Sequence, residues 1–222
     1  MSRSTVLSAP PVGAAAPEFP RLYRALRTPV RGLLERWFGL RIEGLQHLPG
    51  HGPYIVAANH HNYLDGVVLG VSVPAPIAFL VMPRVWRATP LHPPFHRHIG
   101  SIPIDLDRRV DIRALRRALA ALERGAVVGI FPEGPFSVRG RLERGLPGVA
   151  LLALRSGVPV VPAGIHGTWE ALRGRRFYVP RATSLTVRFG APRRFSPDGA
   201  RAREARRGVT ERVMADIAAL LP

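Results

Sequence analysis

The sequence predicts a single α/β domain with a largely parallel central sheet flanked by helices, preceded by an N-terminal amphipathic helical element. Three observations support this fold class. Short apolar runs such as residues 54–58 and 126–131 alternate with segments of helical periodicity. Gly125 and Gly157 each stand where such a helical segment should end. The 222 residues, 46% of them apolar, suffice for one domain with a sizeable core, and no repeat or second domain boundary interrupts the pattern.

The first forty residues divide into two parts. Residues 1–18 are rich in Ala, Pro and Ser without apolar periodicity, which predicts a flexible tail. In residues 19–41, apolar side chains recur at spacings of three and four, with Arg on another side. Pro29 is expected to split this segment into two short helices, because proline lacks a backbone donor. A basic amphipathic segment fits an interfacial membrane anchor, and it fits equally a surface helix packed on the core.

The remaining elements are expected within a domain of residues 42–222. Strands are predicted at residues 40–43, 54–58, 77–82, 99–104, 126–131, 158–163 and 184–189. Helices are predicted at residues 66–73, 111–124, 146–155 and 201–221. Residues 49–53 should form a loop, and the proline-rich residues 83–98 should be irregular.

The composition excludes several kinds of chemistry. There is no Cys, so a thiol nucleophile, a disulfide and a cysteine metal site are ruled out. All 32 basic residues are Arg, which rules out a P-loop lysine and a lysine Schiff base. No run of about 18 apolar residues could span a membrane, and the N-terminus lacks the apolar region of a signal peptide.

The net charge of +17 points to an acidic partner, either nucleic acid or an anionic membrane surface. Only 7% of the residues are aromatic, the Arg residues are spread along the chain, and no helix-turn-helix or single-strand-binding pattern occurs. An anionic membrane surface is therefore the expected partner. A basic nucleic-acid-binding module is the alternative from a different functional class.

The strand predicted at residues 54–58 runs into a polar cluster that contains His60 and Asp65. Across a turn these two side chains can approach each other. A histidine can then act as a general base, and the carboxylate can hold its tautomer. Asn62 followed three positions later by Asp65 also fits a capping box, which is a purely structural explanation.

Another carboxylate stands at the end of a later strand, in Phe131-Pro132-Glu133-Gly134. The ends of parallel strands can face one crevice, although Pro-x-Gly is also ordinary turn chemistry. The histidines at positions 92, 96 and 98 have no nearby carboxylate except Asp105, so no metal site is expected.

Four blocks in this order resemble the glycerolipid acyltransferase family, the 1-acylglycerol-3-phosphate acyltransferases. The blocks are Asn59-His60-x4-Asp65, Gly100-Ser-Ile-Pro-Ile-Asp105, Phe131-Pro-Glu-Gly134 and Val158-Pro-Val-Val-Pro162. The resemblance extends over residues 40–172. Each block is a weak signal alone, but the four together, in order and at this spacing, are specific.

The resemblance implies an O-acyltransferase that acts without a cofactor. His60 would take a proton from an acceptor hydroxyl, and Asp65 would orient the imidazole. The hydroxyl would attack the thioester of acyl-CoA or acyl carrier protein, and the acceptor would be a glycerolipid or lysophospholipid. The enzyme would lie peripherally on the cytoplasmic face of a membrane. The residues expected to bind the acceptor are Glu133, Gly134, Arg108 and Arg139, while Gly100 and Asp105 belong to the second block.

Two positions depart from the family pattern. Members that use a phosphate-bearing acceptor usually carry Arg where this chain has Leu106 and Phe136. Arg forks onto phosphate oxygens with paired charge-assisted hydrogen bonds, which Leu and Phe cannot replace. Either Arg108, Arg139 or Arg141 reaches the phosphate from a shifted position, or the acceptor carries no terminal phosphate monoester.

Overall fold

The computed structural model describes residues 21–87, 89–105, 111–172, 180–196 and 203–222. The predicted tail, residues 1–18, and the positions Leu106 and Arg108 lie outside these described residues.

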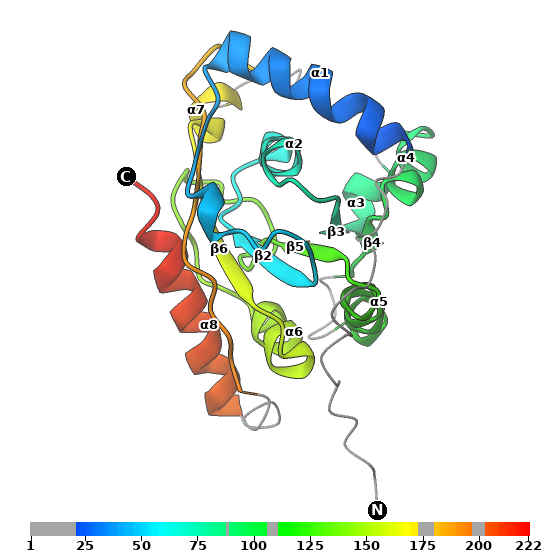
Figure 1. Ribbon diagram of the computed structural model, residues 1–222, viewed down its shortest axis with the longest axis vertical. Helices are drawn as coiled ribbons and strands as arrows, with labels where there is room; N and C mark the ends of the chain where they lie inside the picture. Colours follow the sequence, from blue (N-terminus) through cyan, green and yellow to red (C-terminus); the bar gives the residue numbers. More distant parts are fainter. Residues whose placement is uncertain (1–20, 88, 106–110, 173–179, 197–202) are drawn as a thin grey trace, which may run out of the picture.

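A seven-stranded sheet in the order β1-β7-β6-β2-β5-β3-β4 forms the centre of the protein (Figure 1). Neighbouring strands are parallel except β6 and β7, which are antiparallel. The predicted α/β fold with a largely parallel sheet is confirmed. The strands are β1 (Arg41–Glu43), β2 (Tyr54–Ala58), β3 (Ile77–Val81), β4 (Ile102–Pro103), β5 (Val127–Ile130), β6 (Val160–His166) and β7 (Thr186–Phe189).

Helices cover both faces of the sheet. In Figure 1, α1 and α2 lie on one side, and α5, α6 and α8 lie on the other. The helices are α1 (Arg21–Phe38), the 3-10 turn η1 (Leu45–His47), α2 (Tyr63–Ser72), α3 (Pro83–Trp86), α4 (His92–His98), α5 (Ile112–Glu123), α6 (Gly148–Ser156), α7 (Thr168–Leu172) and α8 (Arg203–Ala218).

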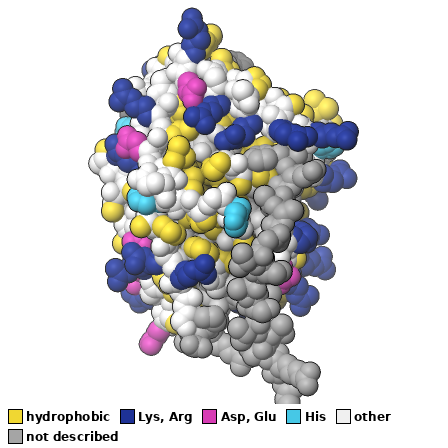
Figure 2. Space-filling view, viewed as in Figure 1, with side chains coloured by type: hydrophobic (Ala, Val, Ile, Leu, Met, Phe, Trp, Pro, Cys, Tyr) yellow, Lys and Arg dark blue, Asp and Glu magenta, His cyan; other side chains and the backbone are white. Residues whose placement is uncertain are grey.

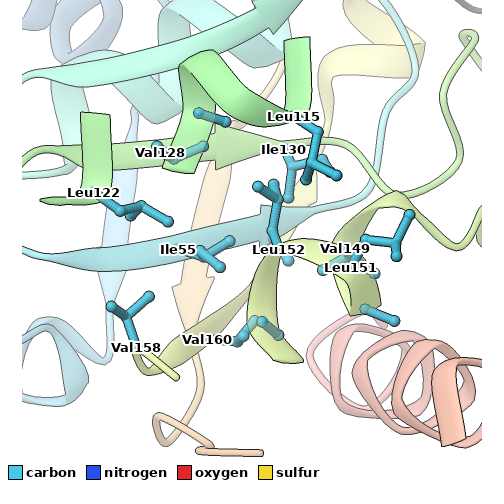
Figure 3. Packing of buried hydrophobic residues seen from close by; sticks show 14 of the residues in the cluster. Ile55, Leu115, Leu122, Val128, Ile130, Val149, Leu151, Leu152, Val158 and Val160 are labelled. Atoms are coloured by element: carbon cyan, nitrogen blue, oxygen red, sulfur yellow. The ribbon is translucent and has the colours of Figure 1, made fainter. Parts of the chain in front are cut away.

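Strand β2 lies between β5 and β6 and is fully buried along its whole length. Its side chains alternate between the two halves of the core. Ile55 and Ala57 pack toward α5 and α6, where sheet and helix side chains interdigitate (Figure 3). Tyr54, Val56 and Ala58 join the cluster beneath α1 and α2. This two-sided burial explains why the strand is a continuous apolar run without polar alternation.

Helix α1 corrects one expectation, because it continues through Pro29 as a single helix. Tertiary contacts on both sides of the proline hold it together. Before Pro29, the Tyr23 hydroxyl donates to Gly70 O across 2.7 Å, and Arg27 donates to Val73 O across 3.2 Å. After it, Leu34 and Phe38 are buried. These contacts outweigh the one backbone hydrogen bond that proline removes.

The face that α1 buries is narrower than its apolar pattern suggests. Leu34 and Phe38 are buried in the core, whereas Leu33 and Trp37 are 52% and 66% exposed. The helix therefore packs on the domain and at the same time presents apolar side chains outward. The structure is therefore consistent with both interpretations of residues 19–41, a helix packed on the core and an interfacial membrane anchor.

The expectation for residues 83–98 was wrong, since they contain the two short helices α3 and α4. Pro83, Pro93 and Pro94 lie in the first turns of these helices, where the missing N–H has no partner to lose. Strand β4 is shorter than the predicted 99–104, and α7 was not expected.

Candidate active site

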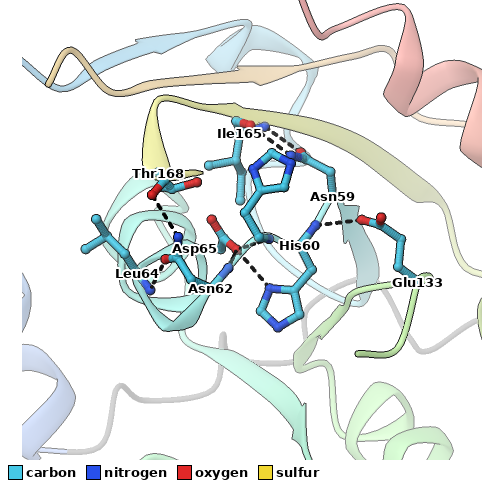
Figure 4. Close-up of polar contacts among 9 residues, drawn as sticks. Asn59, His60, Asn62, Leu64, Asp65, Glu133, Ile165 and Thr168 are labelled. Carbon is cyan, nitrogen blue, oxygen red and sulfur yellow. Dashed lines mark hydrogen bonds and ion pairs between the residues drawn. The ribbon is translucent and has the colours of Figure 1, made fainter. Parts of the chain in front are cut away.

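The ends of three adjacent parallel strands build the site. Ala57 pairs with Ile130 and Ala58 with Ala163, so the residues that follow β2 and β5 emerge at the same edge of the sheet. The Asn59 amide fixes this edge. It donates to Ile165 O across 2.8 Å and accepts the Ile165 N–H across 2.7 Å (Figure 4).

His60 and Asp65 form a hydrogen-bonded pair at this edge. His60 Nδ1 lies 2.9 Å from Asp65 Oδ2, and Asp65 is fully buried (Figure 4). The backbone N–H groups of His61 and Asn62 donate to the same oxygen across 2.6 and 2.7 Å. Three hydrogen-bonding groups thus converge on Oδ2 and hold the carboxylate in place beside the imidazole.

The capping interpretation of Asp65 is also correct. Asn62 is the N-cap of α2, and Asn62 with Asp65 forms a complete capping box. One short sequence therefore serves two purposes. The cap fixes the start of the helix, and the fixed start places the Asp65 carboxylate against the His60 ring.

Aromatic rings enclose the imidazole of His60. Phe131 stacks on it with ring centroids 3.8 Å apart and planes 5° from parallel. Phe136 approaches edge-on at 4.5 Å, and Tyr63 packs on Phe136 at 4.6 Å. These contacts hold the ring in one orientation and keep bulk water from its faces.

Glu133 supports the backbone of His60. Its Oε1 accepts the His60 N–H across 2.7 Å, and its Oε2 accepts the Glu143 N–H across 2.6 Å. Burial raises the pKa of the Glu133 carboxyl to about 7, against the opposing effect of these two backbone donors. The carbonyl of His60 is also held, because it accepts the Ser137 N–H across 2.8 Å.

A pocket of about 410 Å³ opens beside His60. Its wall is formed mainly by apolar side chains from α1, α2, β3, α4 and β5. The pocket wall includes the His60 ring, and next to it Phe131, Gly134 and Phe136. The site therefore combines a positioned imidazole with a mainly apolar pocket.

The structure separates the other predicted site residues from one another. Gly134 lines the pocket, whereas Glu133 does not. Arg139 and Arg141 are exposed in the loop after Gly134, and neither of them lines the pocket. Gly100 is exposed with φ of 74°, a conformation that favours glycine. The Asp105 N–H donates to Asp111 Oδ2 across 2.9 Å. Arg108 lies outside the described residues, so its predicted role carries no structural statement.

The remaining histidines differ in their surroundings. His61 is buried with its ring against Trp169, and burial lowers its pKa. His166 is exposed at the end of β6. Within the described ranges, no group of three or more His, Asp or Glu side chains is placed to hold a metal ion.

The sequence did not predict that aromatic rings surround His60 or that the Asn59 amide is hydrogen-bonded to a neighbouring strand. It also did not predict that the Glu133 carboxyl accepts hydrogen bonds from two backbone N–H groups. The aromatic signal was present in Tyr63, Phe131 and Phe136, but only the fold shows that they surround one ring.

Comparison with known proteins identifies similar chains. The model of the family described as Acyltransferase matches residues 39–166. A chloroplast 1-acyl-sn-glycerol-3-phosphate acyltransferase of Arabidopsis thaliana is 31% identical over 144 residues, which are 61% of this chain and 38% of that protein. The chain thus aligns with well under half the length of this plant relative.

Two bacterial proteins are similar over a larger share of their length. The 1-acyl-sn-glycerol-3-phosphate acyltransferase of Bacillus subtilis is 23% identical over 150 residues, covering 66% of this chain and 72% of that protein. The crystal structure of the 1-acyl-sn-glycerophosphate acyltransferase PlsC from Thermotoga maritima has the same fold, with a TM-score of 0.68 and 24% identity. That similarity covers 89% of this chain and 80% of the other.

Proposed function

The chain belongs to the Acyltransferase family, and on that premise we propose that it moves a fatty acyl group from an acyl thioester to a lipid hydroxyl. The observation that carries this proposal is the His60–Asp65 pair beside a large apolar pocket. The donor is acyl-CoA or acyl carrier protein, and the acceptor is a glycerolipid or lysophospholipid. The reaction uses no cofactor.

His60 is the general base of the proposed reaction. Because Nδ1 is paired with Asp65, Nε2 is the ring nitrogen left for the substrate. A proton on Nδ1, directed at the carboxylate, leaves the lone pair of Nε2 to accept the proton of the acceptor hydroxyl. Asp65 then stabilises the imidazolium.

The deprotonated oxygen attacks the carbonyl carbon of the thioester. The new C–O bond forms, the C–S bond breaks, and the thiolate leaves with the proton that His60 returns. No covalent enzyme intermediate is required, in keeping with a chain that has no Cys.

The apolar pocket is the proposed compartment for lipid chains. Burying each methylene of a chain contributes about 0.8 kcal/mol, so an apolar wall of this extent favours long acyl groups. The bound acyl group would place its carbonyl carbon beside His60, which lines the same pocket.

The relatives and the site suggest different acceptor classes. The names of the relatives suggest 1-acylglycerol 3-phosphate. The packing of Phe136 on His60, at 4.5 Å between ring centroids, favours an acceptor without a phosphate monoester. An aromatic edge beside the base contributes apolar contact and offers no charge to balance a phosphate dianion.

Membrane association at the cytoplasmic face is part of the proposal. Leu33 and Trp37 project outward from α1, where they could enter the boundary between lipid head groups and chains. On the face shown in Figure 2, Arg side chains lie along the top and on both sides, with apolar and some acidic side chains between them. This excess of basic groups suits an anionic surface. None of the described helices has the length and apolar character needed to cross a bilayer.

The test is thiol release from long-chain acyl-CoA and from acyl carrier protein, with matched monoacylglycerol and monoacylglycerol phosphate acceptors. We expect acceptor-dependent release that is lost in His60→Ala and kept in His98→Ala, an exposed histidine outside the pocket. Equal activity of His60→Ala and the unmodified protein would refute the mechanism. A gel shift at near-physiological salt tests the nucleic-acid alternative.

A further inference from the structure

One part of the pocket wall is polar. His96 projects from α4, is 8% exposed and lines the pocket together with Ser101. Most neighbouring side chains in this part of the wall are apolar, among them Val85, Phe95 and Ile99. A polar pair within an apolar wall is unusual, because an unpartnered buried polar group costs about 1–3 kcal/mol.

The His96 ring is held in place from two sides. It stacks on Trp86 with ring centroids 5.2 Å apart and planes 18° from parallel. Nδ1 lies 3.2 Å from Ser101 Oγ, and the Ser101 N–H donates to His96 O across 2.9 Å. Nε2 is buried and has no hydrogen-bond partner within the part of the chain that the structure describes.

The chemistry of this nitrogen narrows the class of ligand. Burial, with the nearby His92, lowers the pKa of His96, so the ring is neutral near pH 7. A neutral imidazole cannot balance a phosphate, but it can exchange a hydrogen bond with an uncharged group. If the Ser101 hydroxyl donates to Nδ1, Nε2 is a donor; if Nδ1 donates to Ser101, Nε2 is an acceptor. A hydroxyl group can satisfy either tautomer.

We propose that His96 and Ser101 form a hydrogen-bonding site for a hydroxyl group of the lipid bound in the pocket. This rests on the function proposed above and makes the pair a determinant of substrate specificity. The hydroxyl belongs either to the acyl chain or to the glycerol part of the acceptor. Substrates that lack it leave Nε2 without a partner, which lowers their affinity.

Binding, measured apart from acyl transfer, tests this site. The full chain is titrated with hexadecanoic acid, with hexadecanoic acids that carry one hydroxyl at different positions, and with monoacylglycerol and its deoxy analogue. Each ligand displaces a fluorescent fatty acid. We expect one hydroxylated ligand to bind about two- to tenfold more tightly than its partner without the hydroxyl. A preference among the acids assigns the hydroxyl to the acyl chain, and a preference for monoacylglycerol assigns it to the acceptor.

His96→Leu should abolish that preference, and Ser101→Ala, which keeps the imidazole and its stacking, should reduce it. The matched control His98→Leu changes an exposed histidine of the same helix and should keep it. Equal ratios in the unmodified protein and His96→Leu, or no preference in the unmodified protein, would overturn the site. Absence of thiol release with an intact binding preference would count against the proposed reaction alone.

Discussion

Oε1 of Glu133 accepts the backbone N–H of His60 across 2.7 Å, while Oε2 of the same carboxyl accepts the Glu143 N–H. A side chain at the end of β5 thereby fixes the backbone at the end of β2. The loop after β5 completes the link, since the Ser137 N–H donates to His60 O. The position of the proposed base is therefore set by a residue 73 positions away in sequence.

The first prediction concerns the pH dependence of stability. The pKa of Glu133 is raised to about 7, above its ordinary value, so the folded state holds this proton more tightly than the unfolded state. The stability due to this group is complete below pH 4 and is lost as the pH rises through 7. Between pH 5 and pH 8 the unfolding free energy of the unmodified protein should therefore fall by roughly 2 to 3 kcal/mol more than that of Glu133→Gln.

Urea unfolding at pH 5 and pH 8 measures this difference. Comparing the two proteins at each pH cancels the titration of the other groups. Glu123→Gln is the matched control, because it removes an exposed carboxyl at the end of α5 that does not contact Glu133. Parallel pH profiles for Glu133→Gln and the unmodified protein would contradict the prediction.

The second prediction separates the two roles of Asp65. Asp65→Asn should lower kcat/KM by about 100-fold or more, because the amide no longer fixes the His60 tautomer or stabilises the imidazolium. Asn62→Ala removes the helix cap and should cost about 1 kcal/mol of stability with a far smaller loss of activity. Thiol release measures the activity of both variants, and thermal melting measures their stability. Equal losses of activity would mean that Asp65 acts only through the helix.

The third prediction concerns Phe136. Replacing it with Arg places a guanidinium beside His60, which can pair with phosphate oxygens. We expect Phe136→Arg to raise activity toward monoacylglycerol phosphate relative to monoacylglycerol by about tenfold or more. Phe136→Leu controls for the loss of the aromatic contact. An unchanged ratio in Phe136→Arg would show that the acceptor head group lies elsewhere.

The fourth prediction concerns the outer face of α1. Deleting residues 19–41 would uncover the core, because Leu34 and Phe38 are buried. Substitution is therefore the sharper test. Leu33→Glu with Trp37→Glu should weaken sedimentation with anionic vesicles by at least about tenfold, since each apolar side chain contributes about 1.5–3 kcal/mol when buried.

Ile112→Glu is the control for this experiment, because Ile112 is also exposed but lies on α5, across the sheet from α1. Vesicle binding that survives the double substitution in α1, or that Ile112→Glu weakens equally, would argue against this surface as the membrane contact.

The strand pattern and the family were accessible from sequence because both depend on local signals. All seven predicted strands are present, and the family resemblance of the four blocks is confirmed by the match over residues 39–166. The pairing of His60 with Asp65 was also predictable, since five positions across a strand–helix turn allow little freedom. The short helices at residues 83–98 were not, because proline at a helix start resembles proline in a loop.

Local sequence patterns identify the residues that can carry the chemistry: a histidine, a nearby carboxylate and a second carboxylate after a later strand. Their contacts with one another depend on the three-dimensional fold. It paired His60 with Asp65, turned Glu133 toward two backbone amides, and enclosed the imidazole between Phe131 and Phe136. The reason is physical. Local spacing fixes contacts within one turn, whereas contacts between strand ends depend on the order and register of a parallel sheet, which no single segment encodes.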